Sequence, residues 1–188
     1  MSTVTRAAEG FNRRVFTVDE ILRMQENGII SPNENFELIE GEVVPMGPKY
    51  VPHERVKSFL GMALAKACPD DWLVGYETSV RLSDRTILEP DLCIYRRDVA
   101  SLMVGVADVL LAIEVSASST SLDRGPKSDL YARAGLPELW IVDVKAETIA
   151  VLSGPRQDGT WSARKVRAWS ESLLHPRLPG LAVRLTDL

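Results

Sequence analysis

The stretch Leu110-Leu111-Ala112-Ile113-Glu114-Val115-Ser116 decides the fold, because it is an apolar run with one carboxylate in its middle. Side chains of an extended strand alternate between two faces, so Glu114 shares a face with Ala112 and Ser116. An ionised carboxylate among apolar neighbours is costly unless a cation or strong hydrogen-bond donors meet it. The sequence therefore predicts a central buried strand with a positively charged group beside Glu114.

The segments on either side of this strand predict an α/β fold with a mixed sheet. We expect a helix capped by Thr17, a hairpin over 36–46, a helix over 52–68, an antiparallel hairpin over 72–82 and 86–95, the central strand over 109–116, a helix over 123–134, a strand over 139–144, a meander over 148–152 and 161–168, and an edge strand over 181–185. The helix over 123–134 lets the strands that it connects run parallel, whereas hairpin neighbours run antiparallel.

Composition and charge limit the class of protein. The chain has 188 residues, 45% of them hydrophobic and 26% charged, which is ordinary for a soluble globular protein. We expect one domain over 16–188 after a flexible basic arm over 1–15. There is neither a membrane-spanning apolar run nor the apolar core of a signal peptide, so the expected location is the cytoplasm, without a membrane partner. A net charge of -4 means that DNA binding would need a local basic surface or a divalent cation.

A second carboxylate precedes the central strand. Asp91 follows Pro90 and lies 23 residues before Glu114, which leaves room for a loop that lets the two strands pair. Two carboxylates facing one space repel each other unless a divalent cation lies between them, and oxygen ligands suit Mg²⁺. The carbonyl of Val115 is a further expected ligand.

Lys127 is the expected positive partner of Glu114. It lies on the helix that follows the central strand, with Asp123 and Tyr131 at four-residue spacing. A structural ion pair of Glu114 and Lys127 without any metal is an open alternative. His53 either hydrogen-bonds the end of its helix or acts at the phosphate or metal, and Tyr131 is a core aromatic or a base-stacking platform.

The two histidines and a pair of arginines also have predicted places. His53 and His175 are the only histidines, too few for a typical zinc enzyme, and His175 is expected at the surface beside Pro176. Arg96 and Arg97 are the best candidates for phosphate contacts, since they follow Asp91 on its strand.

These residues resemble the PD-(D/E)XK nuclease superfamily, in a version whose lysine lies on the following helix, while Ser116 occupies its usual strand position. More closely, the chain is similar over roughly 16–152 to the Uma family of predicted restriction endonucleases. The resemblance is carried by residues 36–42, His53, Pro90, Asp91, Glu114, Val115, Ser116, Asp123, Lys127, Tyr131, Ala132, Gly135 and 137–143.

The resemblance implies a restriction-endonuclease-like core, with a mixed β-sheet flanked by helices, and metal-dependent hydrolysis of DNA phosphodiester bonds. Asp91, Glu114 and Val115 would hold Mg²⁺, with Mn²⁺ as a possible substitute. Lys127 would be the catalytic lysine and Glu37 an auxiliary acid that reaches the metal. We expect a homodimer, because two related sites most simply cut both strands of a duplex.

Two other functions fit the same residues. One is a catalytically inactive nuclease-fold protein that serves as a binding or assembly module. The other is a metal hydrolase of small phosphate esters, which would not need a groove as wide as a duplex.

Overall fold

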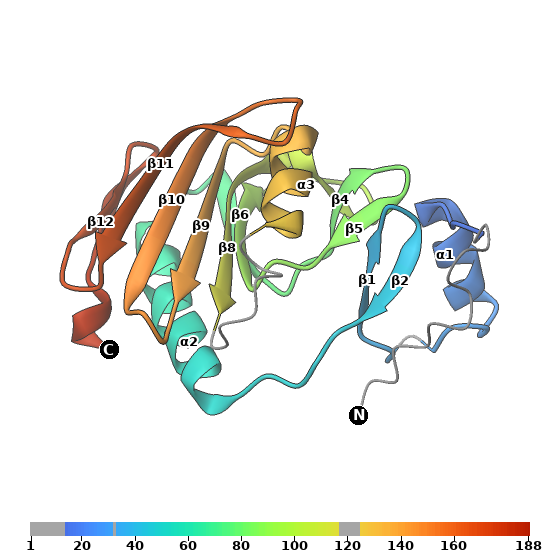
Figure 1. Cartoon of the computed structure of the whole chain (residues 1–188), viewed down its shortest axis with the longest axis horizontal. Coiled ribbons are helices and arrows are strands. Elements are labelled where there is room, and N and C mark those ends of the chain that lie inside the picture. The colour runs from blue at the N-terminus through green and yellow to red at the C-terminus, as the bar shows by residue number, and fades with distance from the viewer. Residues whose placement is uncertain (1–13, 32, 117–124) are drawn as a thin grey trace.

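The computed structural model of the chain describes residues 14–31, 33–116 and 125–188 (Figure 1). Within them the elements, in order, are α1 (Val18–Glu26), β1 (Phe36–Ile39), β2 (Glu42–Pro45), α2 (Val51–Ala67), β3 (Trp72–Tyr76), β4 (Val80–Ser83), β5 (Thr86–Leu88), β6 (Leu92–Arg96), β7 (Val104–Gly105), the short 3-10 helix η1 (Val106–Asp108), β8 (Val109–Ser116), α3 (Pro126–Ala134), β9 (Glu138–Asp143), β10 (Thr148–Pro155), β11 (Trp161–Ala168), β12 (Leu173–His175), β13 (Leu178–Val183) and a second 3-10 helix, η2 (Leu185–Asp187). The predicted basic arm lies mostly, and Asp123 entirely, outside the described residues.

A six-stranded mixed sheet forms the centre of the molecule, in the order β11-β10-β9-β8-β6-β3. The predicted central strand is β8, and all eight of its residues are buried. It pairs antiparallel with β6 and parallel with β9, as its helical connection to β9 requires. The predicted α/β class with a mixed sheet is therefore confirmed.

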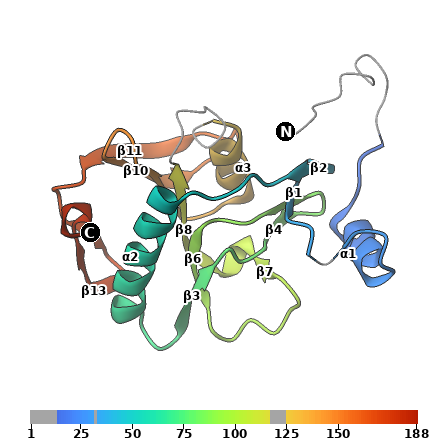
Figure 2. The same cartoon turned by 90° about the horizontal axis from the view of Figure 1, so that it is seen from below.

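Different helices cover the two faces of this sheet (Figures 1 and 2). Val56, Leu60 and Leu64 recur at four-residue spacing on α2 and pack with Leu111 and Ile113 of β8. Tyr131 of α3 packs instead in the cluster that contains Ala112. Because side chains alternate along β8, Glu114 points to the α3 side.

The predicted antiparallel hairpin over 72–82 and 86–95 is confirmed in its pairing, but the structure divides it between two sheets. The strands β3 and β6 pair within the six-stranded sheet, whereas β4 and β5 pair within a second, five-stranded sheet of order β2-β1-β5-β4-β7. One break follows Glu77, whose backbone is left-handed (φ 48°). The other falls at Pro90, which has no N–H to continue the ladder. Asp91 therefore lies where the chain crosses between the sheets.

The β1–β2 hairpin turns at the predicted residues. Glu40 (φ 51°) and Gly41 (φ 88°) are both left-handed, which a tight two-residue turn between twisted strands requires. The strand β1 pairs antiparallel with β5 through Leu38 and Ile87. This pairing places Glu37 beside the crossing at Pro90.

The C-terminal segment differs from its prediction. Instead of one edge strand on a main sheet, β12 and β13 form a two-stranded sheet whose apolar residues, Leu173, Leu178, Leu181 and Val183, join the core around α2. His175, expected at the surface, is buried in an edge-type ring contact with Trp140, at 6.5 Å between ring centroids. Among the helices described, none has the length and apolar character needed to cross a membrane.

Candidate active site

Three carboxylates and one lysine meet between the two large sheets. Glu37 comes from β1, Asp91 from the crossing before β6, Glu114 from β8 and Lys127 from the first turn of α3. All three acidic side chains are buried. The ammonium of Lys127 lies 2.9 Å from Glu37 and 3.9 Å from Glu114. The structure thus brings Lys127 to Glu114, as expected, with Glu37 as the nearer partner.

Asp91 is fixed by the backbone of the central strand. The ladder between β6 and β8 begins with Leu92 opposite Ile113. If the same register continued toward the N-terminus of β6, Pro90 would lie opposite Val115. Pro90 has no N–H and cannot extend the ladder, and the Asp91 carboxylate accepts the N–H of Val115 instead, at 2.8 Å. This hydrogen bond holds the Pro90-Asp91 pair beside Glu114 and Val115.

Glu114 is the most perturbed acid of the group. Complete burial raises its pKa to about 8, and repulsion by Asp91 and Glu37 adds to the rise, while attraction to Lys127 opposes it. The Tyr131 hydroxyl donates a hydrogen bond to Glu114 at 2.8 Å, and burial followed by the charge of Glu114 raises the pKa of Tyr131 well above 10. Tyr131 therefore acts here as a buried donor.

His53 also belongs to the site, although its sequence context left its role open. It lies in the first turn of α2, forms no cap there, and places Nε2 3.0 Å from Asp91 Oδ1. Burial opposes protonation, but the hydrogen bond and the charge of Asp91, and then Glu54, outweigh it and raise the pKa of His53. His53 and the Val115 N–H together hold both oxygens of Asp91.

A second ionic cluster extends from Asp91 along α2. Lys49 lies 3.7 Å from Asp91 and 2.7 Å from Glu77, which also pairs with Lys57. Hydrogen bonds from Lys49 and Lys57 lower the pKa of Glu77 to about 2 despite its partial burial. No local pattern in the sequence marks these contacts, because they depend on the left-handed turn at Glu77.

The oxygen donors of the site determine whether it can hold a divalent cation. In the described part of the chain, no three His, Cys, Asp or Glu side chains form a group able to hold a metal ion. However, Mg²⁺ keeps several waters and is commonly bound by one or two carboxylates. Burial is the main cause of the raised pKa of Glu114, the charges of Asp91 and Glu37 add to it, and a cation beside these carboxylates would oppose the rise. Asp91 and Glu114 therefore fit Mg²⁺ as a pair of oxygen donors.

The two arginines expected near the phosphate lie elsewhere. Asp91 precedes β6 and Arg96 ends it, so roughly 16 Å of strand separates them. Arg96 is paired with Asp98, and Arg97 donates to the carbonyl of Asp70. Phosphate contacts close to the carboxylates must come from other residues.

Comparison with known proteins places the chain in a family. The model of the Uma2 family, described as "Putative restriction endonuclease", matches residues 18–186. The chain belongs to the Uma2 family. The expected family is thereby confirmed, and the match extends beyond the region over which the resemblance was recognised.

A solved structure has the same fold as this Uma2 chain. It is described as the "crystal structure of a putative nuclease belonging to DUF820 from Anabaena variabilis ATCC 29413 at 1.96 A resolution". The two structures agree with a TM-score of 0.70 at 17% sequence identity, over 92% of this chain and 96% of the other. No curated protein matches the chain.

Proposed function

We propose that the protein is a divalent-cation-dependent endodeoxyribonuclease, in which Asp91 and Glu114 hold the cation and Lys127 is the catalytic lysine. One observation carries the proposal: Lys127 lies within 3.9 Å of Glu114 and 2.9 Å of Glu37, although it is displaced from the strand to the helix. Membership in a family of predicted restriction endonucleases supports the reaction class.

The proposed reaction adds water across a phosphodiester bond. Water attacks phosphorus and one P–O bond to a sugar breaks, leaving a phosphate on one fragment and a hydroxyl on the other. Lys127 can donate hydrogen bonds to a phosphoryl oxygen or to the attacking water, because Glu37 and Glu114 fix its ammonium between them. A bound divalent cation would supply Lewis-acid polarisation of the phosphate.

The other residues of the site position these groups. The Val115 N–H and His53 orient Asp91, and Tyr131 orients Glu114. Glu37 also accepts the N–H of Glu89 at 3.0 Å, which ties the lysine to the five-stranded sheet. We propose Mg²⁺ as the cation, with Mn²⁺ as a substitute, and the Val115 carbonyl as an additional ligand.

Plasmid cleavage with and without Mg²⁺ tests the proposal. We expect the wild type to nick or cut supercoiled DNA only with the cation, and K127A and D91A to lose about 100-fold or more of this activity. Lys66→Ala, at the exposed end of α2, is the matched lysine control and should cut normally. Urea unfolding of each variant would verify that it is folded.

Cleavage by K127A or D91A at the wild-type rate would contradict the assigned roles. Hydrolysis of small phosphate diesters without cleavage of DNA would identify a small-ester hydrolase instead. Binding of DNA without cleavage under either cation would identify a non-catalytic module.

A further inference from the structure

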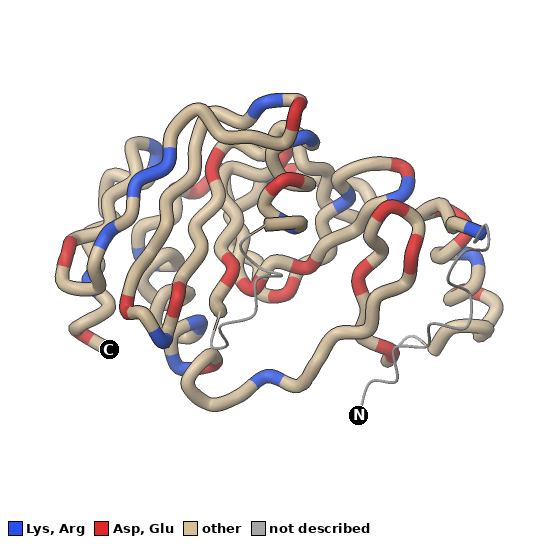
Figure 3. The backbone as a smooth tube through the Cα atoms, in the orientation of Figure 1, with Lys and Arg blue, Asp and Glu red and all other residues tan. Residues whose placement is uncertain are grey.

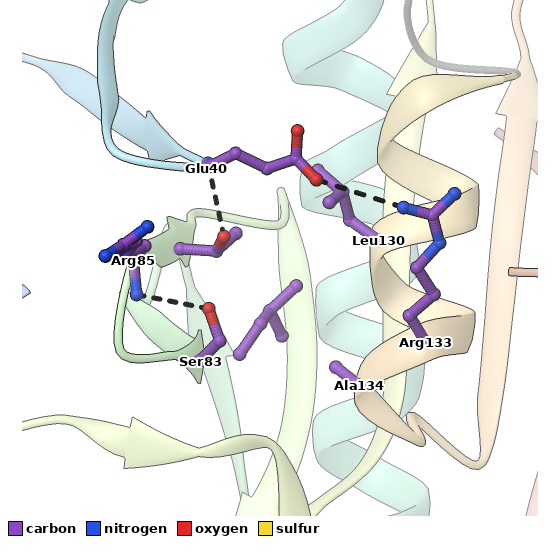
Figure 4. Close-up of a pocket in the computed structure, with 8 residues that line it drawn as sticks. Glu40, Ser83, Arg85, Leu130, Arg133 and Ala134 are labelled. Atoms are coloured by element: carbon purple, nitrogen blue, oxygen red, sulfur yellow. Dashed lines mark hydrogen bonds and ion pairs between the residues drawn. The ribbon is translucent and has the colours of Figure 1, made fainter. Parts of the chain in front are cut away.

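A cavity of about 440 Å³ lies beside α3, on the side that faces the five-stranded sheet (Figure 4). Its size falls in the range of pockets that accept small ligands, about 300 to 1,000 Å³. Apolar side chains of Leu82, Leu130 and Ala134 line it, and two arginines, Arg85 and Arg133, lie on its opposite walls. An adjoining hollow continues along α3 to Gly125 and Pro126, next to Lys127.

The cavity and the candidate active site are built from the same two elements. Lys127 of α3 pairs with Glu37 of β1 at one end, and Arg133 of α3 pairs with Glu40, just after β1, at the other. Six residues of helix rise about 9 Å and three residues of strand about 10 Å. The two ion pairs therefore lie at successive positions along α3, separated by about 9 Å along its axis.

The two ion pairs differ in strength. Lys127 and Glu37 are mostly buried and 2.9 Å apart, whereas Arg133 and Glu40 are 3.8 Å apart with more than half of each side chain exposed. An exposed pair of this kind contributes little free energy, so Glu40 can be displaced from Arg133 at small cost. Figure 4 shows the Glu40 side chain reaching across the opening of the cavity toward Arg133.

The charges that face the cavity and the adjoining hollow are balanced when no ligand is bound. Arg85 and Arg133 are opposed by Glu40 in the cavity and by Asp129 in the adjoining hollow. The Ser83 hydroxyl accepts the Arg85 N–H, and the Thr86 hydroxyl accepts the Glu40 N–H, so both hydroxyls hold the walls in place. Displacing the Glu40 side chain leaves the Arg133 guanidinium beside an apolar floor.

We propose that this cavity binds a backbone phosphate of the DNA strand, about one or two nucleotides from the phosphate at Lys127, with Glu40 as the group that the phosphate replaces. The spacing follows from the separation of about 9 Å along α3, because successive phosphates of one strand lie farther apart in space than their rise of about 3.4 Å along the duplex axis. The apolar floor would receive the sugar. The inference rests on the proposed function and adds the path of the DNA strand, which would follow α3 from Lys127 to Arg133.

Fluorescence anisotropy with a labelled DNA duplex in EDTA measures binding without cleavage. We expect Arg133→Gln to weaken binding about fivefold and to reduce the slope of log affinity against log salt by about one, since one phosphate contact is lost. Glu40→Gln removes the competing carboxylate and should tighten binding. These opposite signs distinguish a phosphate site from a general loss of structure.

The matched controls are Arg184→Gln and Asp187→Asn, which alter a similarly exposed pair near the C-terminus, at 3.5 Å. Both should bind as the wild type does. If the wild type binds but Arg133→Gln keeps its affinity and salt slope, the cavity is not a phosphate site and the proposed function stands. If the wild type does not bind the duplex at low salt, either in EDTA or in a repeat with Ca²⁺ in its place, the proposed substrate fails and the cavity proposal fails with it.

Discussion

Glu114 is the residue on which the candidate site depends. An apolar strand with one carboxylate was the first sign of a special position, and the structure buries that carboxylate among Asp91, Glu37 and Lys127. Its strongly raised pKa means that the folded, cation-free protein holds a proton that the unfolded chain releases near its ordinary value of 4.5. This difference couples protonation of Glu114 to folding.

The coupling predicts how stability changes with pH in EDTA. The folded pKa is raised, so stability from this group is complete below about 4.5 and is lost as pH rises toward about 8. Each unit of pKa separation corresponds to about 1.4 kcal/mol. Glu114→Gln keeps the shape but removes the titration, so its free energy of unfolding should fall less between these pH values.

Urea unfolding at a series of pH values compares the two proteins. Taking the difference between wild type and Glu114→Gln cancels the titration of His53 and other groups. Parallel pH profiles would mean that Glu114 does not hold its proton in the folded state.

The residues of the site differ in how far the sequence could predict them. Glu114 and Asp91 stand out because a carboxylate in an apolar strand and a Pro-Asp pair are local signals. Lys127 follows from the helix after the strand, and Glu37 was expected from the family resemblance alone. The contact between His53 and Asp91 was not predicted, because it depends on how α2 is rotated against the sheet. Roles in binding and catalysis stay predictions for all of them.

At the scale of elements, the β1–β2 hairpin links stability to the site, because β1 carries Glu37. The turn needs Gly41, because its φ is 88°. The segment before α1 also packs against the Gly41 Cα. An added Cβ would meet the Val15 Cβ at 2.6 Å and the Phe16 carbonyl oxygen at 2.9 Å. Both the backbone conformation and the packing therefore exclude a side chain.

Gly41→Ala should consequently destabilise the protein more than backbone strain alone explains. Gly135→Ala is the matched control, since its φ is 85° but no atom lies within 4 Å of an added Cβ. We expect about 1 to 2 kcal/mol of lost stability for Gly135→Ala and about 1 to 3 kcal/mol more for Gly41→Ala. Equal losses in denaturant unfolding would show that the contacts of Gly41 do not matter.

Elements with local signals were predicted well. The capping box of Thr17 and Glu20, the turn at Glu40 and Gly41, and the helix opened by Pro52 are all present. The segment over 72–95 was predicted in its antiparallel pairing but not in its division between two sheets, because that division depends on distant partners: β1 for the β4–β5 half and β8 for the β3–β6 half. Hydrophobic alternation within the segment cannot distinguish one sheet from two.

At the scale of the molecule, the candidate site lies where the two sheets join. Glu37 belongs to the five-stranded sheet, Glu114 to the six-stranded sheet, and Asp91 to the crossing between them. Figure 3 shows Lys and Arg interspersed with Asp and Glu along the described backbone, in keeping with the net charge of -4. Attraction of DNA would then depend on local charges at the site and on a bound cation.

A cation held by Asp91 and Glu114 would link β8 to the crossing between the two sheets, so its binding should stabilise the folded state. Saturation at about 100 times the dissociation constant contributes about 2.7 kcal/mol, which for a chain of this size raises Tm by about 5 to 10 °C. We expect this rise when Mg²⁺ or Mn²⁺ is titrated into the wild type. Asp91→Asn should abolish it, whereas Asp158→Asn, in the exposed turn between β10 and β11, should retain it. An unchanged Tm in the wild type would instead favour the non-catalytic module, since a ligand bound only by the folded state must stabilise that state.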